Sequence, residues 1–78
     1  MLMGRVAGVN KEKRILSIRT PGGAEREVRV SQDALIMRER RRSRFEEIER
    51  GDMVQLRFER LEDGTRTAVR IMSRSAPR

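Results

Sequence analysis

Apolar and polar residues alternate through most of this chain, and a period of two predicts β-strands. The clearest case is residues 25–31, where Val28 and Val30 point to one side and Glu27 and Arg29 to the other. The same alternation predicts four more strands, at residues 2–9, 14–20, 53–60 and 65–73. Their expected inward residues are Leu16, Ile18, Val54, Leu56, Phe58, Val69 and Ile71.

Turn-forming residues separate these predicted strands. Turns are expected at residues 10–13, 21–23 and 62–64, where Asn, Pro, Gly and the pair Asp-Gly suit the backbone angles of tight connections. Gly4 and Gly8 interrupt the first predicted strand, and a glycine inside a strand often marks a bulge or the bend of a barrel. The chain is therefore expected to form short strands with short connections.

The region between the third and fourth long strands admits two interpretations. A single helix over residues 31–50, capped near Ser31 or Asp33 and ended by Gly51, would bury a stripe with Arg41 in its middle. The interpretation that we favour avoids burying this charge. It divides the region into a short strand, a basic loop and a short helix, at residues 34–37, 38–42 and 44–50. Ser43 with Glu46 three residues later has the capping-box pattern, which favours a helix start at Ser43.

Short strands leave exposed edges unless the sheet closes on itself. Five or six strands with one helix among them match the layout of the OB-fold, and an SH3-like barrel is the main competitor. We therefore expect an all-β protein, a small closed five- to six-stranded OB-like barrel with one short helix before the fourth long strand. The barrel is expected to span residues 1–73 and the flexible tail residues 74–78.

The junction before the fourth long strand carries the strongest local signal. Gly51 is expected to take the left-handed conformation that ends a helix, so Gly51→Ala should destabilise the fold. Asp52 is expected to accept backbone hydrogen bonds at the entry to the strand. Phe45 and Ile48 are expected to plug one end of the barrel.

Two short patterns are the Gly-x-Val opening at Gly4 and Val6 and the Ile-x-x-Gly-Asp-x-Val junction that begins at Ile48. Both resemble a bacterial family of OB-like small β-barrel domains of unknown function. Further similar positions are Val9, Val28, Val30, Ile36, Phe45, Ala68 and Ile71. The resemblance implies the barrel fold and no chemistry, so it implies no functional residue. Many members of the family look exported, and they usually have a shorter polar turn where this chain carries residues 38–42.

The amino-acid composition limits the classes of function that this chain can have. The 78 residues include 19 Lys+Arg against 12 Asp+Glu, a formal net charge of +7, which favours anionic partners. The chain has no Cys and no His, which excludes disulfides, thiolate or imidazole metal sites and histidine-dependent catalysis. Its paired carboxylates are expected in turns or on the exposed helix. We therefore expect no enzyme activity, no metal and no cofactor.

The location of the protein is also an expectation from the sequence. The chain has no apolar run of membrane-spanning length, and its first residues lack the apolar core of a signal peptide. We expect no membrane contact and a cytoplasmic location, unless a leader has been removed.

The candidate contact residues are five arginines between residues 38 and 44. They are Arg38, Arg40, Arg41, Arg42 and Arg44. Arginine binds phosphate with two parallel hydrogen bonds and stacks on bases. Binding to single strands usually adds aromatic platforms, and this chain has no Trp or Tyr and places Phe45 and Phe58 at predicted core positions. Contact with nucleic acid would therefore be weak, salt-dependent and independent of base sequence.

Three functions stay open. The first is a non-enzymatic binding or assembly module of unassigned role, which would act through the barrel surface and the loop of residues 38–44 on a nucleic acid or a protein partner. The second is a weak nucleic-acid-binding protein that uses the five arginines, with Arg57 and Arg70 extending the patch if they face the same side. The third is a homo-oligomeric structural domain whose arginines only provide solubility. The methionines are expected to fill gaps in the core, but Met53 and Met72 would form a dimer contact if they faced outward.

Overall fold

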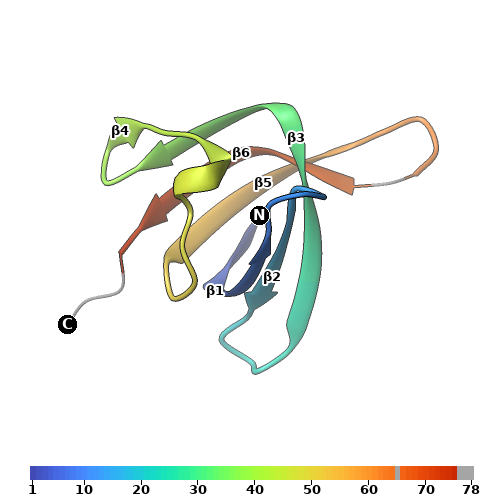
Figure 1. The fold of residues 1–78 in the computed structure, drawn as a ribbon. Coiled ribbons are helices and arrows are strands. Elements are labelled where there is room, and N and C mark those ends of the chain that lie inside the picture. Colours follow the sequence, from blue (N-terminus) through green and yellow to red (C-terminus); the bar gives the residue numbers. More distant parts are fainter. Residues whose placement is uncertain (65, 76–78) are drawn as a thin grey trace.

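The computed structural model describes residues 1–64 and 66–75 and contains almost only β-structure (Figure 1). Its elements are β1 (Leu2–Asn10), β2 (Ile15–Arg19), β3 (Glu25–Arg38), β4 (Arg41–Arg42), the 3₁₀ turn η1 (Phe45–Glu47), β5 (Met53–Arg60) and β6 (Arg66–Arg74). Within this described part of the chain, no helix is long and apolar enough to cross a membrane.

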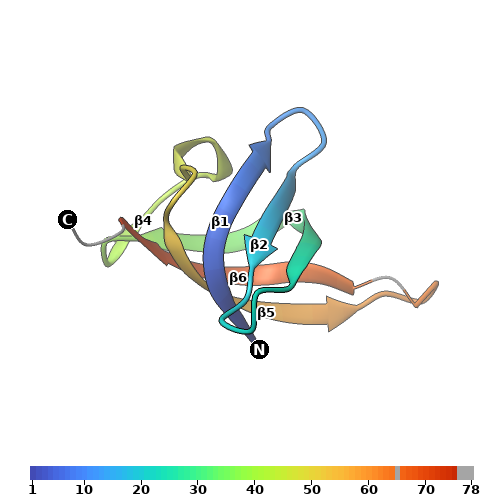
Figure 2. The same cartoon turned by 90° about the horizontal axis from the view of Figure 1, so that it is seen from below.

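The strands form one sheet that closes on itself. The order is β2-β1-β5-β6-β3, and a further pairing of β2 with β3 joins the two ends into a five-stranded barrel. Among the described residues, the short strand β4 pairs only with the C-terminal end of β3. All pairings are antiparallel except that of β3 with β6, which is parallel. Figure 2 shows β1 and β2 crossing over β5 and β6 at a steep angle. The expected closed all-β barrel is confirmed.

The core consists of the inward positions of the strands and of η1. Its buried apolar residues are Val6, Leu16, Ile18, Val28, Val30, Ile36, Phe45, Ile48, Val54, Leu56, Ala68 and Ile71. Phe58 is only half-buried and packs against this cluster. The prediction for Val69 is wrong, because Val69 is an extra residue in β6, between Arg70 opposite Arg57 and Ala68 opposite Phe58. This bulge makes Ala68 the inward residue.

The region before β5 differs from both interpretations of the sequence. The predicted strand at 34–37 is the second half of β3, which continues through Ser31 with a change of register against β6 between Val30 and Leu35. The predicted helix at 44–50 is wrong, and so is the single long helix, because only Phe45–Glu47 turns, as a 3₁₀ turn. Ser43 does not cap it: its hydroxyl is buried and makes no hydrogen bond among the described residues. One turn is enough to bury both Phe45 and Ile48.

The C-terminal end of β6 also shifts by one residue. The strand extends to Arg74, which the sequence placed in the tail. The backbone amide of Ser75 then donates to a carboxylate oxygen of Glu39. Thr65, the expected first residue of this strand, and residues 76–78 of the expected tail lie outside the described residues.

Gly51 has the backbone conformation that the sequence predicted, with φ of 95°. Its amide donates to the Val6 carbonyl over 2.7 Å, and the Val6 amide donates to the Asp52 carbonyl over 2.8 Å. These hydrogen bonds join the turn before β5 to β1 and hold the left-handed residue in place.

We expect Gly51→Ala to lower the free energy of unfolding by about 1–2 kcal/mol, because a residue with a Cβ is strained at this φ. The open space around Gly51 does not relieve that strain. Urea unfolding measures the change. Gly22→Ala is the control, because Gly22 has equally open surroundings and a φ outside the left-handed region. Equal midpoints for the two variants would contradict the prediction.

Candidate binding surface

Arg38, the first of the five candidate arginines, is held by an ion pair. Its Nε donates to Oδ2 of Asp52 over 3.0 Å, and its Nη2 donates to Oδ1 over 3.1 Å. Nη2 also lies 3.6 Å from a carboxylate oxygen of Glu49. The hydrogen bonds to Asp52 raise the pKa of Arg38 above its ordinary value. The two guanidinium nitrogens that could bind a phosphate in this way already bind Asp52 within the chain. Arg38 therefore positions the hairpin and does not contact a partner.

Asp52 is the only buried carboxylate in the described part of the chain, with 3% of its surface exposed. Its Oδ2 also accepts from the Ser73 hydroxyl over 3.0 Å and from the Glu49 amide over 3.1 Å. Burial by itself raises the pKa of Asp52, but the hydrogen bonds from Arg38, Glu49 and Ser73 outweigh it and leave the pKa below its ordinary value. A carboxylate that stays ionised cannot act as a general acid at neutral pH. It joins β3, β5 and β6 instead.

The β3–β4 hairpin turns through two residues without glycine. Glu39 and Arg40 have φ of 52° and 66°, the signs of a type I′ turn, and Arg38 pairs with Arg41 across it. The Glu39 amide donates to the Ser73 carbonyl over 3.0 Å, and the Glu39 carboxylate accepts from the Ser75 amide. The hairpin is therefore fastened to β6, which fixes where Arg40 lies.

The other four candidate arginines are exposed. Arg40 lies in the hairpin turn, Arg41 and Arg42 form β4, and Arg44 precedes η1. Among the described residues, none of these four forms an ion pair. The structure thus separates the five predicted residues into one that organises the hairpin and four that are open to solvent.

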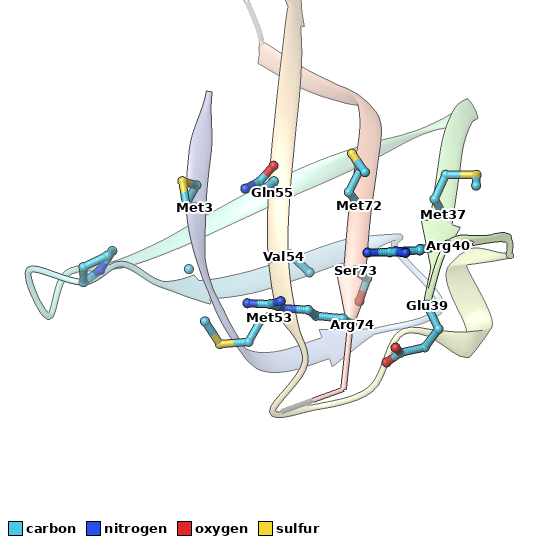
Figure 3. Close-up of a pocket in the computed structure, with 12 residues that line it drawn as sticks. Met3, Met37, Glu39, Arg40, Met53, Val54, Gln55, Met72, Ser73 and Arg74 are labelled. Atoms are coloured by element: carbon cyan, nitrogen blue, oxygen red, sulfur yellow. The ribbon is translucent and has the colours of Figure 1, made fainter. Parts of the chain in front are cut away.

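A row of methionines crosses the outer surface of the barrel beside this hairpin. In the cross-strand register Met3 lies opposite Gln55, Gln55 opposite Met72, Met72 opposite Met37 and Met37 opposite Arg42. Residues directly opposite each other project from the same face of a sheet. Figure 3 shows Met3, Gln55, Met72 and Met37 side by side across the strands. We call these four residues the methionine row.

The methionine row forms the floor of an open groove of about 520 Å³, which Met53, Glu39, Arg40 and Arg74 also line (Figure 3). Met3 and Met72 are 52% and 48% exposed. The expectation that the methionines fill the core is therefore wrong. Because the inward positions beside them belong to Val54 and Ile71, Met53 and Met72 point outward.

Arginines surround the methionine row on both sides. In the neighbouring register Met53 lies opposite both Arg5 and Arg74, and on the far side Arg57 lies opposite Arg70. We call the surrounding residues the arginine rim: Arg5, Arg40, Arg42, Arg57, Arg70 and Arg74. Glu39, the one carboxylate that lines the groove, is already bound by the Ser75 amide. Within the described part of the chain, the surface therefore combines exposed thioethers with arginines that form no ion pair.

The neighbouring β2–β3 face of the barrel has mixed charges. On the outer face of these strands, Arg19 lies opposite Glu25 and Ser17 opposite Glu27, while Arg29 lies opposite Ile15. Arg19 also lies opposite Arg5 of the arginine rim, so this face begins at one border of the groove. Beyond that border, acidic and basic side chains alternate, whereas arginines gather around the groove.

Comparison with protein-family models, curated proteins and solved structures finds no match to this chain. The resemblance to the small β-barrel family therefore stays a prediction. Among the described residues, no group of three or more acidic, His or Cys side chains is placed to hold a metal ion.

Proposed function

We propose that this protein is a non-enzymatic binding module that binds an anionic macromolecule at the groove. The observation that carries the proposal is an exposed, mostly apolar row enclosed by arginines that form no ion pair among the described residues. Arg57 and Arg70 lie directly opposite each other, and like charges in this position destabilise a sheet. A bound anion would remove that repulsion and would place carboxylates or phosphates against both sides of the groove.

We also propose that the barrel is of the OB type. The closed order β1-β2-β3-β6-β5, with one short 3₁₀ turn before β5, supports this assignment. OB-folds commonly bind through the face of their second and third strands. That face here has alternating charges, whereas the groove lies on β1, β5, β6 and the end of β3. The proposed binding surface is therefore displaced around the barrel.

A weak, sequence-independent interaction with nucleic acid is the second candidate. It is favoured by the four exposed arginines of the hairpin, Arg40, Arg41, Arg42 and Arg44. Each phosphate that they neutralise releases counterions, so salt would weaken binding steeply. The aromatic platforms of single-strand binders are missing, because Phe45 is buried and Phe58 packs against the core. Nucleic-acid binding would therefore depend on contacts between arginine and phosphate alone.

A homo-oligomer is the third candidate from the sequence. The outward position of Met53 and Met72 is the condition for a dimer contact at this surface. A two-fold dimer would, however, bring the arginine rims of both copies together. Sedimentation of the free protein at low and at high concentration tests this candidate, and we expect a monomer at both.

The proposal predicts where anions bind. We expect Arg57→Thr/Arg70→Thr to weaken binding of a fluorescein-labelled oligoglutamate at low salt by at least fivefold, because both charges flank the groove. Fluorescence anisotropy across a salt series measures the change. The variant should fold at least as well as the wild type, since it removes a repulsive pair.

The matched control is Arg26→Thr/Arg29→Thr, which removes the same charge from two exposed positions of β3. We expect its binding to change by less than about twofold, because neither arginine lines the groove or lies opposite an arginine of the rim. Equal losses in the two variants would show that only net charge matters, and no binding at low salt would refute the module itself.

A further inference from the structure

We infer that the groove takes an acidic amphipathic helical segment of a partner protein, with its apolar stripe on the methionine row. This inference rests on the proposed function and specifies the partner. It follows from three properties of the surface: its length, the chemistry of its floor and the placement of its charges.

The methionine row has the length of a short helix. From Met3 to Met37 it crosses β1, β5, β6 and β3, which is three strand spacings or about 14 Å. A helix rises 1.5 Å per residue, so positions i and i+10 are about 15 Å apart. Apolar residues at i, i+3, i+7 and i+10 form one stripe along such a helix and would contact the row over its whole length.

The floor of the groove is adaptable and mostly apolar. Methionine has three rotatable bonds and a polarizable sulfur, and it recurs in surfaces that accept varied apolar side chains. Gln55 interrupts the row at its second position, between Met3 and Met72, and offers an amide that donates and accepts (Figure 3). The segment would therefore present three apolar anchors and one position that tolerates a polar side chain.

The charges around the methionine row indicate which residues should border the apolar stripe of the bound segment. Arg5 and Arg74 lie on one side of the methionine row, and Arg57 and Arg70 on the other. A helix with carboxylates on both borders of its apolar stripe would pair with both sides at once. A second copy of this chain lacks such a surface at the groove, and a nucleic acid would leave the exposed methionines without apolar partners.

The test uses two peptides of identical composition. The first is a labelled 14-residue peptide with Leu at the four stripe positions and Glu on both borders, and the second is its scramble without helical periodicity. Anisotropy at a fixed low salt concentration measures both, beside a single-stranded oligonucleotide of similar charge. We expect the amphipathic peptide to bind at least tenfold more tightly than the other two probes.

A pair of variants ties the binding to the methionines. Met3→Ser/Met72→Ser should weaken the amphipathic peptide by about tenfold, because each half-exposed thioether loses apolar contact area without a change of charge. Leu61→Ser is the matched control: Leu61 is 46% exposed, does not line the groove, and should leave the affinity unchanged. Circular dichroism of each variant confirms that it is folded.

The outcomes separate this inference from the proposed function. Equal binding of peptide and scramble, or tighter binding of the oligonucleotide, would overturn the helical partner and leave a polyanion-binding module. An unchanged affinity of Met3→Ser/Met72→Ser for the amphipathic peptide would also overturn the helical partner. Absence of binding by all three probes would overturn the proposed function as well.

Discussion

Gly4→Ala should lower the free energy of unfolding by about 2–3 kcal/mol, as expected for overpacking in a closed core. Gly4 is buried in β1, where a Cβ would lie 2.4 Å from the carbonyl oxygen of Arg19 and 2.7 Å from Cγ2 of Ile18. The first of these atoms belongs to the backbone of β2, so no rotamer change relieves the contact. The two strands would have to move apart at the place where β1 also pairs with β5.

Gly8→Ala provides a stringent control in the same strand. The Cβ there would meet only Ser17 side-chain atoms at 3.9 Å, an ordinary van der Waals distance. We expect this variant to change stability by no more than about 0.5 kcal/mol, with a stabilising sign if the unfolded chain loses more freedom than the folded one. Urea unfolding of both variants decides the matter. A Gly4→Ala variant as stable as Gly8→Ala would mean that β1 and β2 separate without cost.

These two glycines show how far the sequence predicts the fold. It marked both as bulge or bend positions, and the register between β1 and β2 does shift between Val6 and Gly8. It did not distinguish them, because the close approach at Gly4 depends on Arg19, which is adjacent only in the folded barrel. Strand positions followed from alternation, whereas pairing and closure depend on contacts between distant segments.

The missing helix has the same explanation. Ser43 and Glu46 form a capping-box pattern, but such a pattern reports a local preference and not the demands of the core. The barrel needs Phe45 and Ile48 buried, and one 3₁₀ turn is enough to place both. Ser43 points into the protein instead of capping the turn.

The candidate surface was only partly predictable. The number and spacing of the hairpin arginines predicted that they are exposed. The sequence did not predict the ion pair of Arg38, because Asp52 lies 14 residues away along the chain. The outward methionines left a signal: Met53 precedes Val54, and Met72 follows Ile71. Adjacent residues in a strand face opposite sides, so they cannot all be in the core.

The hairpin and the groove depend on one buried carboxylate. Asp52 fixes Arg38 at the end of β3 and Ser73 in β6, and both lie next to groove residues. Through these contacts the network holds the hairpin turn and Arg40 beside Met72. Loss of Asp52 would therefore disturb both the stability of the barrel and the shape of the proposed site.

Asp52→Asn should destabilise the protein by about 2–3 kcal/mol. The two carboxylate oxygens of Asp52 act only as acceptors and together accept four hydrogen bonds. An asparagine keeps one oxygen and places an NH₂ group against a donor, whichever way it turns. Arg38 also loses its buried counter-charge. The expected loss stays below that of a fully buried pair because the Arg38 side chain is 21% exposed.

Glu49→Gln separates this network from simple charge loss. It removes the same formal charge beside Arg38, but from a side chain that is 73% exposed and 3.6 Å away. We expect a change of no more than about 0.5 kcal/mol, the range of exposed ion pairs. Urea unfolding of the two variants measures the difference. If Glu49→Gln were as damaging as Asp52→Asn, the buried hydrogen bonds would have no special role.

The effect of Asp52 should also depend on pH with a definite sign. Its pKa in the folded protein lies below the ordinary value, so the unfolded chain takes up a proton first as the pH falls. The stability that Asp52 supplies is fully present above the unfolded pKa of about 3.9 and is lost as the pH falls through the lower, folded value. The pKa of Glu39 is lowered too, by the amide and then the hydroxyl of Ser75, so only the comparison of wild type with Asp52→Asn isolates Asp52. The stability gap between the two proteins should be constant from about pH 5 to 7 and narrow below about pH 4, whereas a gap that widens in acid would mean that Asp52 is protonated in the native protein.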